Sequence, residues 1–205
     1  MDIFEWADME MQVLECTKCD LSETRQNAVF GQGSTNAGIF IIGEGPGEEE
    51  DKQGLPFIGR SGQLLDKILS ACNFNREEHV FIGNIVKCRP PGNRVPTPEE
   101  KDACMPYLLR QIEMIDPSII ILLGGTALKG LIDPNGKITQ VRGTWMEWNN
   151  RLVIPTFHPS ALLRNPPLKK DAWEDFKKVF FKYRELVDPR HTSPNIPVRG
   201  DSQQD

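Results

Sequence analysis

Four short apolar runs, rich in β-branched residues, constrain the fold of this 205-residue chain more than any other feature of its sequence. Each run has the length of a strand. None alternates between apolar and polar positions, which is typical of strands buried on both faces of a parallel sheet. We therefore expect four central strands. The runs lie at residues 39–43, 80–86, 118–124 and 152–157.

Helical stretches lie between these runs. The helix predicted at 97–115 begins with Thr97, which can cap a helix, and Pro98, which suits the first helical position. Strands that alternate with helices predict an α/β fold, a three-layer α/β/α sandwich with a central four-stranded, mainly parallel sheet. In such sheets, functional residues gather in the loops at the carboxyl ends of the strands. The predicted helices lie at 61–72, 97–115, 126–132 and 171–187.

One domain accounts for most of the chain, because 205 residues suffice for one sizeable core. We expect residues 1–187 to form it and residues 1–11 to be helical. The tail at 188–205 contains three prolines and only two large apolar residues, Ile196 and Val198. So little apolar surface cannot offset the entropy lost on ordering, and the tail is predicted to be disordered.

The charge distribution excludes some functions. A net charge of −5 argues against a broadly basic protein that coats DNA. Two segments, 84–94 and 158–170, nevertheless carry basic residues and no acidic ones. Such segments can bind a few phosphates, although ordinary solvated surface charge explains them equally well.

The chain has no features of a membrane or secreted protein. It contains no run of 18 apolar residues, and its first eleven residues carry four acids where a signal peptide would be basic and then apolar. We therefore expect a soluble, cytoplasmic protein with no membrane partner.

The five cysteines indicate a metal site rather than a disulfide framework, because their number is odd and no secretion signal is evident. Cys16 and Cys19 form a Cys-x-x-Cys pair that can chelate a metal, and Cys88 and Cys104 could complete a set of four thiolates. Four thiolates suit zinc or a [4Fe–4S] cluster. Structural zinc sites usually combine two short Cys-x-x-Cys pairs, and this chain has only one, which favours the cluster. Alternatively, Cys88 and Cys104 are buried core thiols, as we expect for Cys72.

A glycine-rich loop at 43–59 follows the first strand. It matches neither a phosphate-binding loop nor a dinucleotide fingerprint, and the acids between Glu44 and Asp51 would repel a phosphate. Its glycines instead let backbone groups approach a neutral, planar ligand. Phe57 could stack on such a ligand, or it could belong to the core.

Two polar residues stand at the ends of other strands. Asn84 lies near the end of the second run, where its amide could bind a planar edge that carries an N–H and a C=O, or could cap a turn. His158 directly follows the fourth run, which makes it a candidate catalytic residue, with a structural role as the alternative.

Together these segments resemble the uracil-DNA glycosylase superfamily, and specifically its iron–sulfur family 4 of bacteria and archaea. The first loop matches Gly-Glu-Gly-Pro-Gly-x-x-Glu-Asp at 43–51 and Gly-x-Pro-Phe-x-Gly at 54–59. The second matches Asn-x-x-Lys-Cys-Arg-Pro-Pro at 84–91, and the third matches His-Pro-x-x-Leu-Leu-Arg at 158–164. The resemblance extends over about residues 12–187.

The resemblance implies a monofunctional DNA-repair enzyme, a hydrolase of N-glycosyl bonds. Such an enzyme flips uracil out of DNA, cleaves its glycosidic bond and leaves an abasic site. Uracil-containing DNA is then the partner, and we expect a monomer. The resemblance further implies a [4Fe–4S] cluster, regarded in the family as structural, on Cys16, Cys19, Cys88 and Cys104.

The resemblance also assigns roles around the base. Phe57 would stack on the flipped uracil, and Asn84 would bind its O4 and N3. Backbone groups of Glu44 and Gly45 would complete the pocket. His158 would stabilise the departing uracil anion at O2, as an oxyanion hole does.

Water activation and DNA contacts involve a second group of residues. Glu50 is the candidate for positioning water, because glycine replaces the aspartate of the best-known branch. Leu162 or Leu163 would wedge into the vacated base stack. Arg164 and Lys87 would contact phosphates.

An alternative function uses the same residues. The chain could be a metal-stabilised protein that binds uracil-DNA or single-stranded DNA without turnover, with zinc in place of the cluster. A colourless preparation that contained zinc and no iron would favour it.

Overall fold

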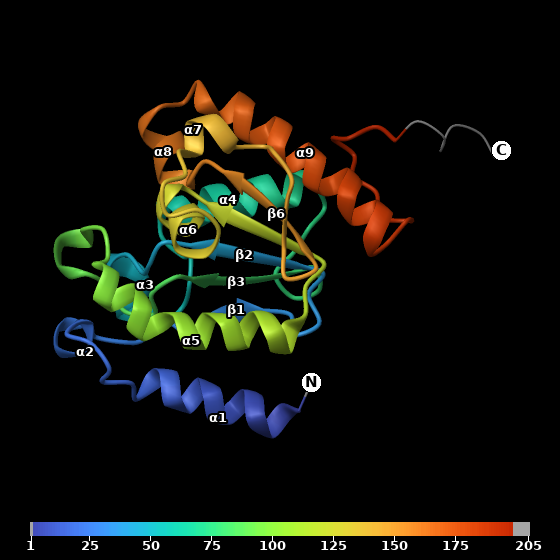
Figure 1. The fold of residues 1–205 in the computed structure, drawn as a ribbon. Helices are drawn as coiled ribbons and strands as arrows, with labels where there is room; N and C mark the ends of the chain where they lie inside the picture. The colour runs from blue at the N-terminus through green and yellow to red at the C-terminus, as the bar shows by residue number, and fades with distance from the viewer. Residues whose placement is uncertain (1, 199–205) are drawn as a thin grey trace.

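A six-stranded mixed sheet forms the centre of the computed structural model, which describes residues 2–198 (Figure 1). The strand order is β1-β3-β2-β4-β6-β5. The four inner strands are parallel, and β1 and β5 pair antiparallel with their neighbours at the two edges. The strands are β1 Gln32–Gly33, β2 Ile39–Gly43, β3 Val80–Asn84, β4 Ile119–Leu123, β5 Met146–Trp148 and β6 Arg151–Thr156.

The predicted α/β/α sandwich is confirmed, with a difference in strand number. The four predicted strands are the four parallel ones. The two additional edge strands are two and three residues long and are not buried. They are too short to show an apolar run, and backbone pairing with β3 and β6 makes them strands, although Met146 and Trp148 of β5 also pack against the core.

Helices cover both faces of the sheet, as Figure 1 shows. Phe40 and Ile42 of β2 face one layer, which contains α1 and α5, whereas Ile39 and Ile41 face the other, which contains α4 and α9. Both faces of each central strand are therefore apolar. The helices are α1 Ile3–Leu14, α2 Leu21–Thr24, α3 Glu48–Gln53, α4 Arg60–Ala71, η1 Pro91–Asn93, α5 Pro98–Ile115, α6 Gly125–Leu131, α7 Ile138–Val141, α8 Pro159–Arg164 and α9 Leu168–Leu186.

Helix α5 begins where its capping residues predict. The Thr97 side chain accepts a hydrogen bond from the Glu100 backbone N–H, and the Glu100 carboxylate accepts one from the Thr97 N–H. Pro98 occupies the first helical position. Within residues 2–198, no helix is both long and apolar enough to cross a membrane.

The segment 188–198 packs against the domain, so the prediction of a disordered tail is wrong for these residues. His191 is buried, its ring stacks on Phe74, and its Nε2 lies 2.9 Å from the Cys72 carbonyl oxygen. Ile196 is also buried. A few aromatic and apolar contacts hold a segment that its composition alone predicts to be loose; residues 199–205 lie outside the described part of the chain.

Candidate active site and cysteine cavity

A groove opens at the edge of the sheet where the parallel strands end. The loops after β2, β3, β4 and β6 line it, together with the first turns of α3, α6 and α8. Phe57, Asn84 and His158 all contribute to its wall. Parallel strands bring their carboxyl ends to the same edge, and therefore residues far apart in the sequence meet here.

Gly43, the last residue of β2, lets Phe57 and Asn84 lie side by side. A Cβ at Gly43 would be 2.4 Å from Asn84 Oδ1 and 2.6 Å from Phe57 Cζ. Gly43 also pairs with Asn84 in register across β2 and β3. A larger residue would displace the ring or the amide, so this part of the groove requires glycine.

Asn84 offers the groove an unused acceptor. Its side-chain Oδ1 is buried and finds no hydrogen-bond partner within residues 2–198. Buried polar atoms are nearly always paired, because leaving one unpaired costs stability. An unpaired amide oxygen on a groove wall is therefore suited to a ligand that brings an N–H group.

His158 is the N-cap of α8. Its Nδ1 accepts a hydrogen bond from the Ser160 backbone N–H at 3.1 Å, and the Ser160 hydroxyl lies 2.8 Å from the same atom. Because Nδ1 is an acceptor, the neutral ring carries its proton on Nε2. Gly124, directly after β4, lies close to His158: a Cβ at this glycine would be 3.1 Å from His158 Cβ.

The environment keeps His158 neutral. Burial lowers the pKa of His158 to about 4, and the nearby Arg164 also lowers it, whereas Glu50 raises it. The imidazole is therefore uncharged near pH 7 and donates from Nε2. Its ring centroid lies 5.6 Å from that of Phe57, with an angle of 36° between the planes.

Two carboxylates of the groove have structural partners. Glu50 Oε1 accepts the backbone N–H groups of Ile58 and Gly59 at 3.0 and 2.9 Å, which ties α3 to the Phe57 loop. Glu44 accepts a hydrogen bond from the Thr126 hydroxyl. Thr126 was not predicted as a site residue, although it stands in the first turn of α6, directly after the predicted strand β4. Next to Glu44, Gly45 also lines the groove, and a Cβ there would lie 2.7 Å from a methyl group of Val86.

Lys87 cannot contact a phosphate, contrary to the prediction. It is only 1% exposed, and its Nζ donates to the Asn84 carbonyl oxygen at 3.1 Å and to Gln111 Oε1 at 2.6 Å. Burial lowers the pKa of Lys87 to about 8. The side chain turns inward, where the Asn84 carbonyl oxygen and Gln111 accept its hydrogen bonds.

The predicted wedge is corrected in part. Leu162 is 1% exposed and packs with Phe157 and Ala172, because it lies on the face of α8 that meets α9. Leu163 is half-buried. Arg164, in contrast, is exposed and lines the groove, as a residue that contacts a phosphate should.

The groove has two further basic residues, one of which, Arg94, ends the basic segment 84–94 of the sequence. Arg60 and Arg94 line it together with Arg164. Arg94 forms a bidentate pair with Glu100 at 2.8 and 2.6 Å. Basic groups at the rim, beyond the acids of α3, give the groove places where phosphates could bind.

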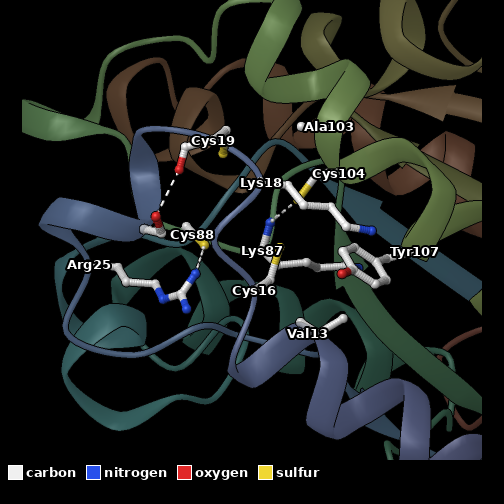
Figure 2. A pocket seen from close by; sticks show the side chains of 11 residues that line it. Val13, Cys16, Lys18, Cys19, Arg25, Lys87, Cys88, Ala103, Cys104 and Tyr107 are labelled. Carbon is white, nitrogen blue, oxygen red and sulfur yellow. Dashed lines mark hydrogen bonds between the residues drawn. The ribbon is translucent and has the colours of Figure 1, made fainter.

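Four cysteines line a second cavity (Figure 2). Cys16 and Cys19 approach it from the turn after α1, Cys88 from the loop after β3 and Cys104 from α5. Cys72 lies elsewhere, in the core beneath α4, as predicted. The sequence predicted this grouping, which no single segment of the chain could produce.

Positive and polar groups surround these sulfur atoms. Arg25 donates from Nη1 to Cys88 Sγ at 3.0 Å, and the Lys87 backbone N–H donates to Cys104 Sγ at 3.3 Å, as Figure 2 shows. Burial raises the pKa of Cys88 to about 11, whereas Arg25 lowers it. Both hydrogen bonds favour the thiolate, which is the form that binds a metal.

Comparisons with known proteins identify the class of protein to which this fold and groove belong. The family model of the Uracil DNA glycosylase superfamily matches residues 30–177, which include all three loop motifs. The chain belongs to this superfamily.

Within the superfamily, the chain is similar to type-4 enzymes. It is 51% identical to the type-4 uracil-DNA glycosylase of Thermotoga maritima over 174 residues, which cover 82% of this chain and 89% of the relative. The type-4 uracil-DNA glycosylase of Sulfurisphaera tokodaii is 46% identical, covering 86% and 82%. That of Saccharolobus solfataricus is 47% identical, covering 82% of each chain. The resemblance to family 4 is thus confirmed.

Proposed function

We propose that this protein is a uracil-DNA glycosylase that hydrolyses the N-glycosidic bond of uracil in DNA and leaves an abasic site. Family membership supports this function, and the type-4 relatives carry this name. The unpaired Oδ1 of Asn84 carries the proposal within the structure, because it is a buried acceptor beside an aromatic ring. Uracil brings the N–H group and the planar face that these two groups match.

The base reaches this groove only outside the duplex. A glycosylase therefore flips the nucleotide out and pays the unstacking cost through contacts in the pocket. Phe57 stacks on the base and Asn84 binds its Watson–Crick edge, with backbone groups at Glu44 and Gly45 beside it.

His158 supplies the main stabilisation of the transition state. As the glycosidic bond breaks, its electron pair moves to uracil, and negative charge grows on O2. The neutral imidazole donates its Nε2–H to that oxygen. A neutral donor does not have to lose a proton to the leaving group, and its pKa of about 4 keeps it in this form.

Glu50 is proposed to orient the attacking water. It lines the groove, and the hydrogen bonds from Ile58 and Gly59 to Oε1 hold its carboxylate in place. The negative charge also faces the oxocarbenium-like sugar and favours it electrostatically. Because a stabilised uracil anion leaves readily, the nucleophile needs only modest activation.

The four cysteines are proposed to hold a [4Fe–4S] cluster. They supply the donor set that such a cluster requires. Arg25 and the Lys87 backbone N–H donate to two of the four sulfur atoms and favour the thiolate form that a cluster or zinc would need. The chain has only one short Cys-x-x-Cys pair, which favours the cluster over a structural zinc site. The role of the cluster here is structural: it would join the turn after α1 to the loop that follows Asn84.

The test is release of uracil from an oligonucleotide with one labelled uracil site, followed by alkaline cleavage of abasic sites. After alkali, the uracil strand that was incubated with iron-loaded protein should be cleaved, and the matched thymine oligonucleotide should stay intact. His158→Ala is the control for a contaminating glycosylase. A shifted DNA band without cleavage would contradict turnover and support the binding-protein alternative.

A further inference from the structure

Phe57 has an unusual backbone conformation. Its φ is +51°, a left-handed value that bulky residues rarely adopt. Such a conformation persists only where neighbouring groups determine it. Its ring nevertheless forms part of the groove wall, next to His158. The structure must therefore contain a device that holds this backbone.

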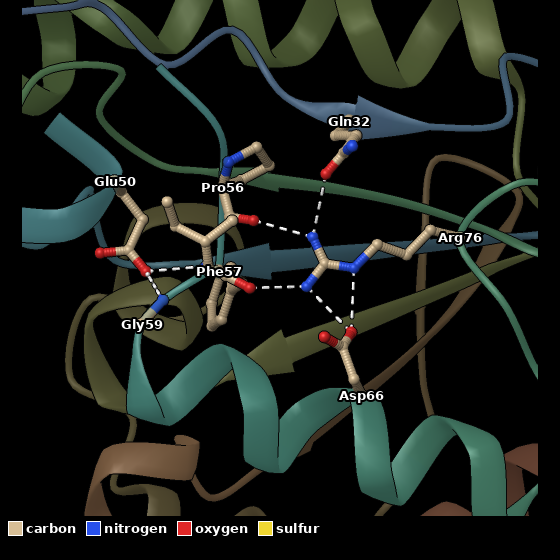
Figure 3. Close-up of polar contacts among 8 residues, drawn as sticks. Gln32, Glu50, Pro56, Phe57, Gly59, Asp66 and Arg76 are labelled. Carbon is tan, nitrogen blue, oxygen red and sulfur yellow. Dashed lines mark hydrogen bonds and ion pairs between the residues drawn. The ribbon is translucent and has the colours of Figure 1, made fainter. Parts of the chain in front are cut away.

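Arg76 is the first part of that device. From the loop between α4 and β3, it donates to the Pro56 carbonyl oxygen at 2.8 Å and to the Phe57 carbonyl oxygen at 2.6 Å (Figure 3). It also donates from Nη1 to Gln32 Oε1 at 3.1 Å and from Nε to Asp66 Oδ1 at 2.9 Å, and its Nη2 forms an ion pair with the same Asp66 oxygen at 2.9 Å. The four hydrogen bonds and the ion pair together engage all three nitrogens of the guanidinium.

Two further contacts complete the support of the loop. Glu50 accepts the next two backbone N–H groups, those of Ile58 and Gly59. The backbone of α4 lies directly against Phe57, since a Cβ at Gly62 would be 1.8 Å from the Phe57 carbonyl oxygen. Arg76 thus binds the two carbonyl groups on one side of the loop, and Glu50 binds the two N–H groups that follow.

We propose that Arg76 is a positioning residue for uracil recognition. Through the Pro56 and Phe57 carbonyls it sets the orientation of the Phe57 ring, although it does not line the groove itself. Lysine could not replace it, because an ammonium group has three donors and lacks the planar fork that bridges two carbonyls and a carboxylate. The inference deepens the proposed function and rests on it.

The test is a double-mutant cycle on the full, iron-loaded chain. Arg76→Lys should lower the single-turnover rate of uracil release about 10-fold, because the ring is misplaced. Phe57→Ala should lower it further, and the Arg76→Lys/Phe57→Ala double variant should be no slower than Phe57→Ala alone. The proposal would be overturned if the double variant lost rate by the product of the two single losses. It would also be overturned if Arg76→Lys released uracil as fast as the parent chain.

Matched controls separate positioning from loss of stability. Arg151, at the start of β6 and away from the groove, also binds a carbonyl and a carboxylate, those of Asn149 and Asp116. Arg151→Lys should leave the rate of uracil release unchanged. If Arg76→Lys fails to fold, Asp66→Asn replaces it, because the Asp66 side chain is 48% exposed and the substitution weakens the ion pair that holds Arg76. The rate of uracil release should then fall a few-fold.

A second measurement does not depend on activity. Amide hydrogen exchange at Ile58 and Gly59 should become faster in Arg76→Lys and stay unchanged in Arg151→Lys. If the parent chain released no uracil, the proposed function would fail while this structural result could still be obtained. Unchanged exchange in Arg76→Lys would show that Arg76 does not hold the backbone around Phe57.

Discussion

The groove and the cysteine cavity lie at the two ends of one segment, 84–88, yet they are built differently. Asn84 and Phe57 of the groove are held by the sheet register, by close contacts at Gly43 and by backbone hydrogen bonds. The cysteines come from three separate segments and lie around a space. Close packing and hydrogen bonds therefore fix the groove, whereas the four cysteines surround a space that the proposed cluster would fill.

The largest effect is expected in the groove, at His158. His158→Ala should lower the single-turnover rate of uracil release by about 10²- to 10³-fold, as the loss of one oxyanion donor does. Thermal unfolding of the variant should show that the fold is retained. A rate within threefold of the parent chain would show that another group stabilises the anion.

Substitutions at Asn84 and Glu50 compare how much base recognition and water orientation each contribute to the rate of uracil release. Asn84→Ala should reduce the rate about 100-fold, because the edge of uracil then loses its buried partner. Glu50→Gln should cost less, since a glutamine oxygen can still accept the N–H groups of Ile58 and Gly59. Single-turnover kinetics in the reverse order would reassign both residues.

Loss of one cysteine should affect stability more than chemistry. Cys16→Ala should abolish iron binding and lower the free energy of unfolding by about 2.7 kcal/mol, the contribution of a ligand present at 100 times its Kd. Below the melting temperature, the folded variant should keep most of its rate of uracil release. Cys72→Ala is the control: it should retain iron, because Cys72 is a core residue away from the cavity. A rate loss as large as that of His158→Ala would disprove the separation of the two sites.

The pH dependence of stability should report on the groove. His158 has its pKa lowered to about 4 in the folded state, against 6.5 as the ordinary value. Between these two values the unfolded chain binds more protons, so stability falls as the pH falls. From pH 6.5 to pH 5 the loss attributable to His158 is up to about 2 kcal/mol. The free energy of unfolding, measured by denaturant titration at several pH values, should fall less steeply with falling pH in His158→Ala than in the parent chain. The same pH dependence in both chains would refute a neutral histidine in the folded state.

The smallest effect is expected at the rim. Arg164→Ala should weaken DNA binding a few-fold at low salt and reduce the slope of log affinity against log salt by about 1, as the loss of one phosphate contact does. Lys87 is buried, so Lys87→Met should leave that slope unchanged. A reduced slope for Lys87→Met would mean that this segment opens when DNA binds.

Local pattern was sufficient for much of the fold and the site. Uninterrupted apolar runs predicted the four parallel strands, and Thr97 with Pro98 predicted the start of α5. Strand ends predicted that Phe57, Asn84 and His158 would share a groove. These features depend on neighbours in sequence or on the general geometry of parallel sheets, and a single sequence contains both.

Other features could not be read from local pattern. A basic segment was predicted to bind phosphates through Lys87, but the Asn84 carbonyl oxygen and Gln111 hold that side chain inside the protein. Composition predicted disorder for the segment that contains His191, but Phe74 and Cys72 hold it. In each case the deciding partner lies on another element, or on the opposite side of a turn.

The sequence by itself determined the four parallel strands, in their order along the chain, and the residue types at their ends, because periodicity and turn chemistry are local properties. Only the tertiary structure decided which side chains face the groove and which are buried, and it alone joined Arg76 to Phe57 and Arg25 to Cys88. Burial and hydrogen bonding are properties of pairs of segments, and those pairs exist only once the sheet and its helices have come together.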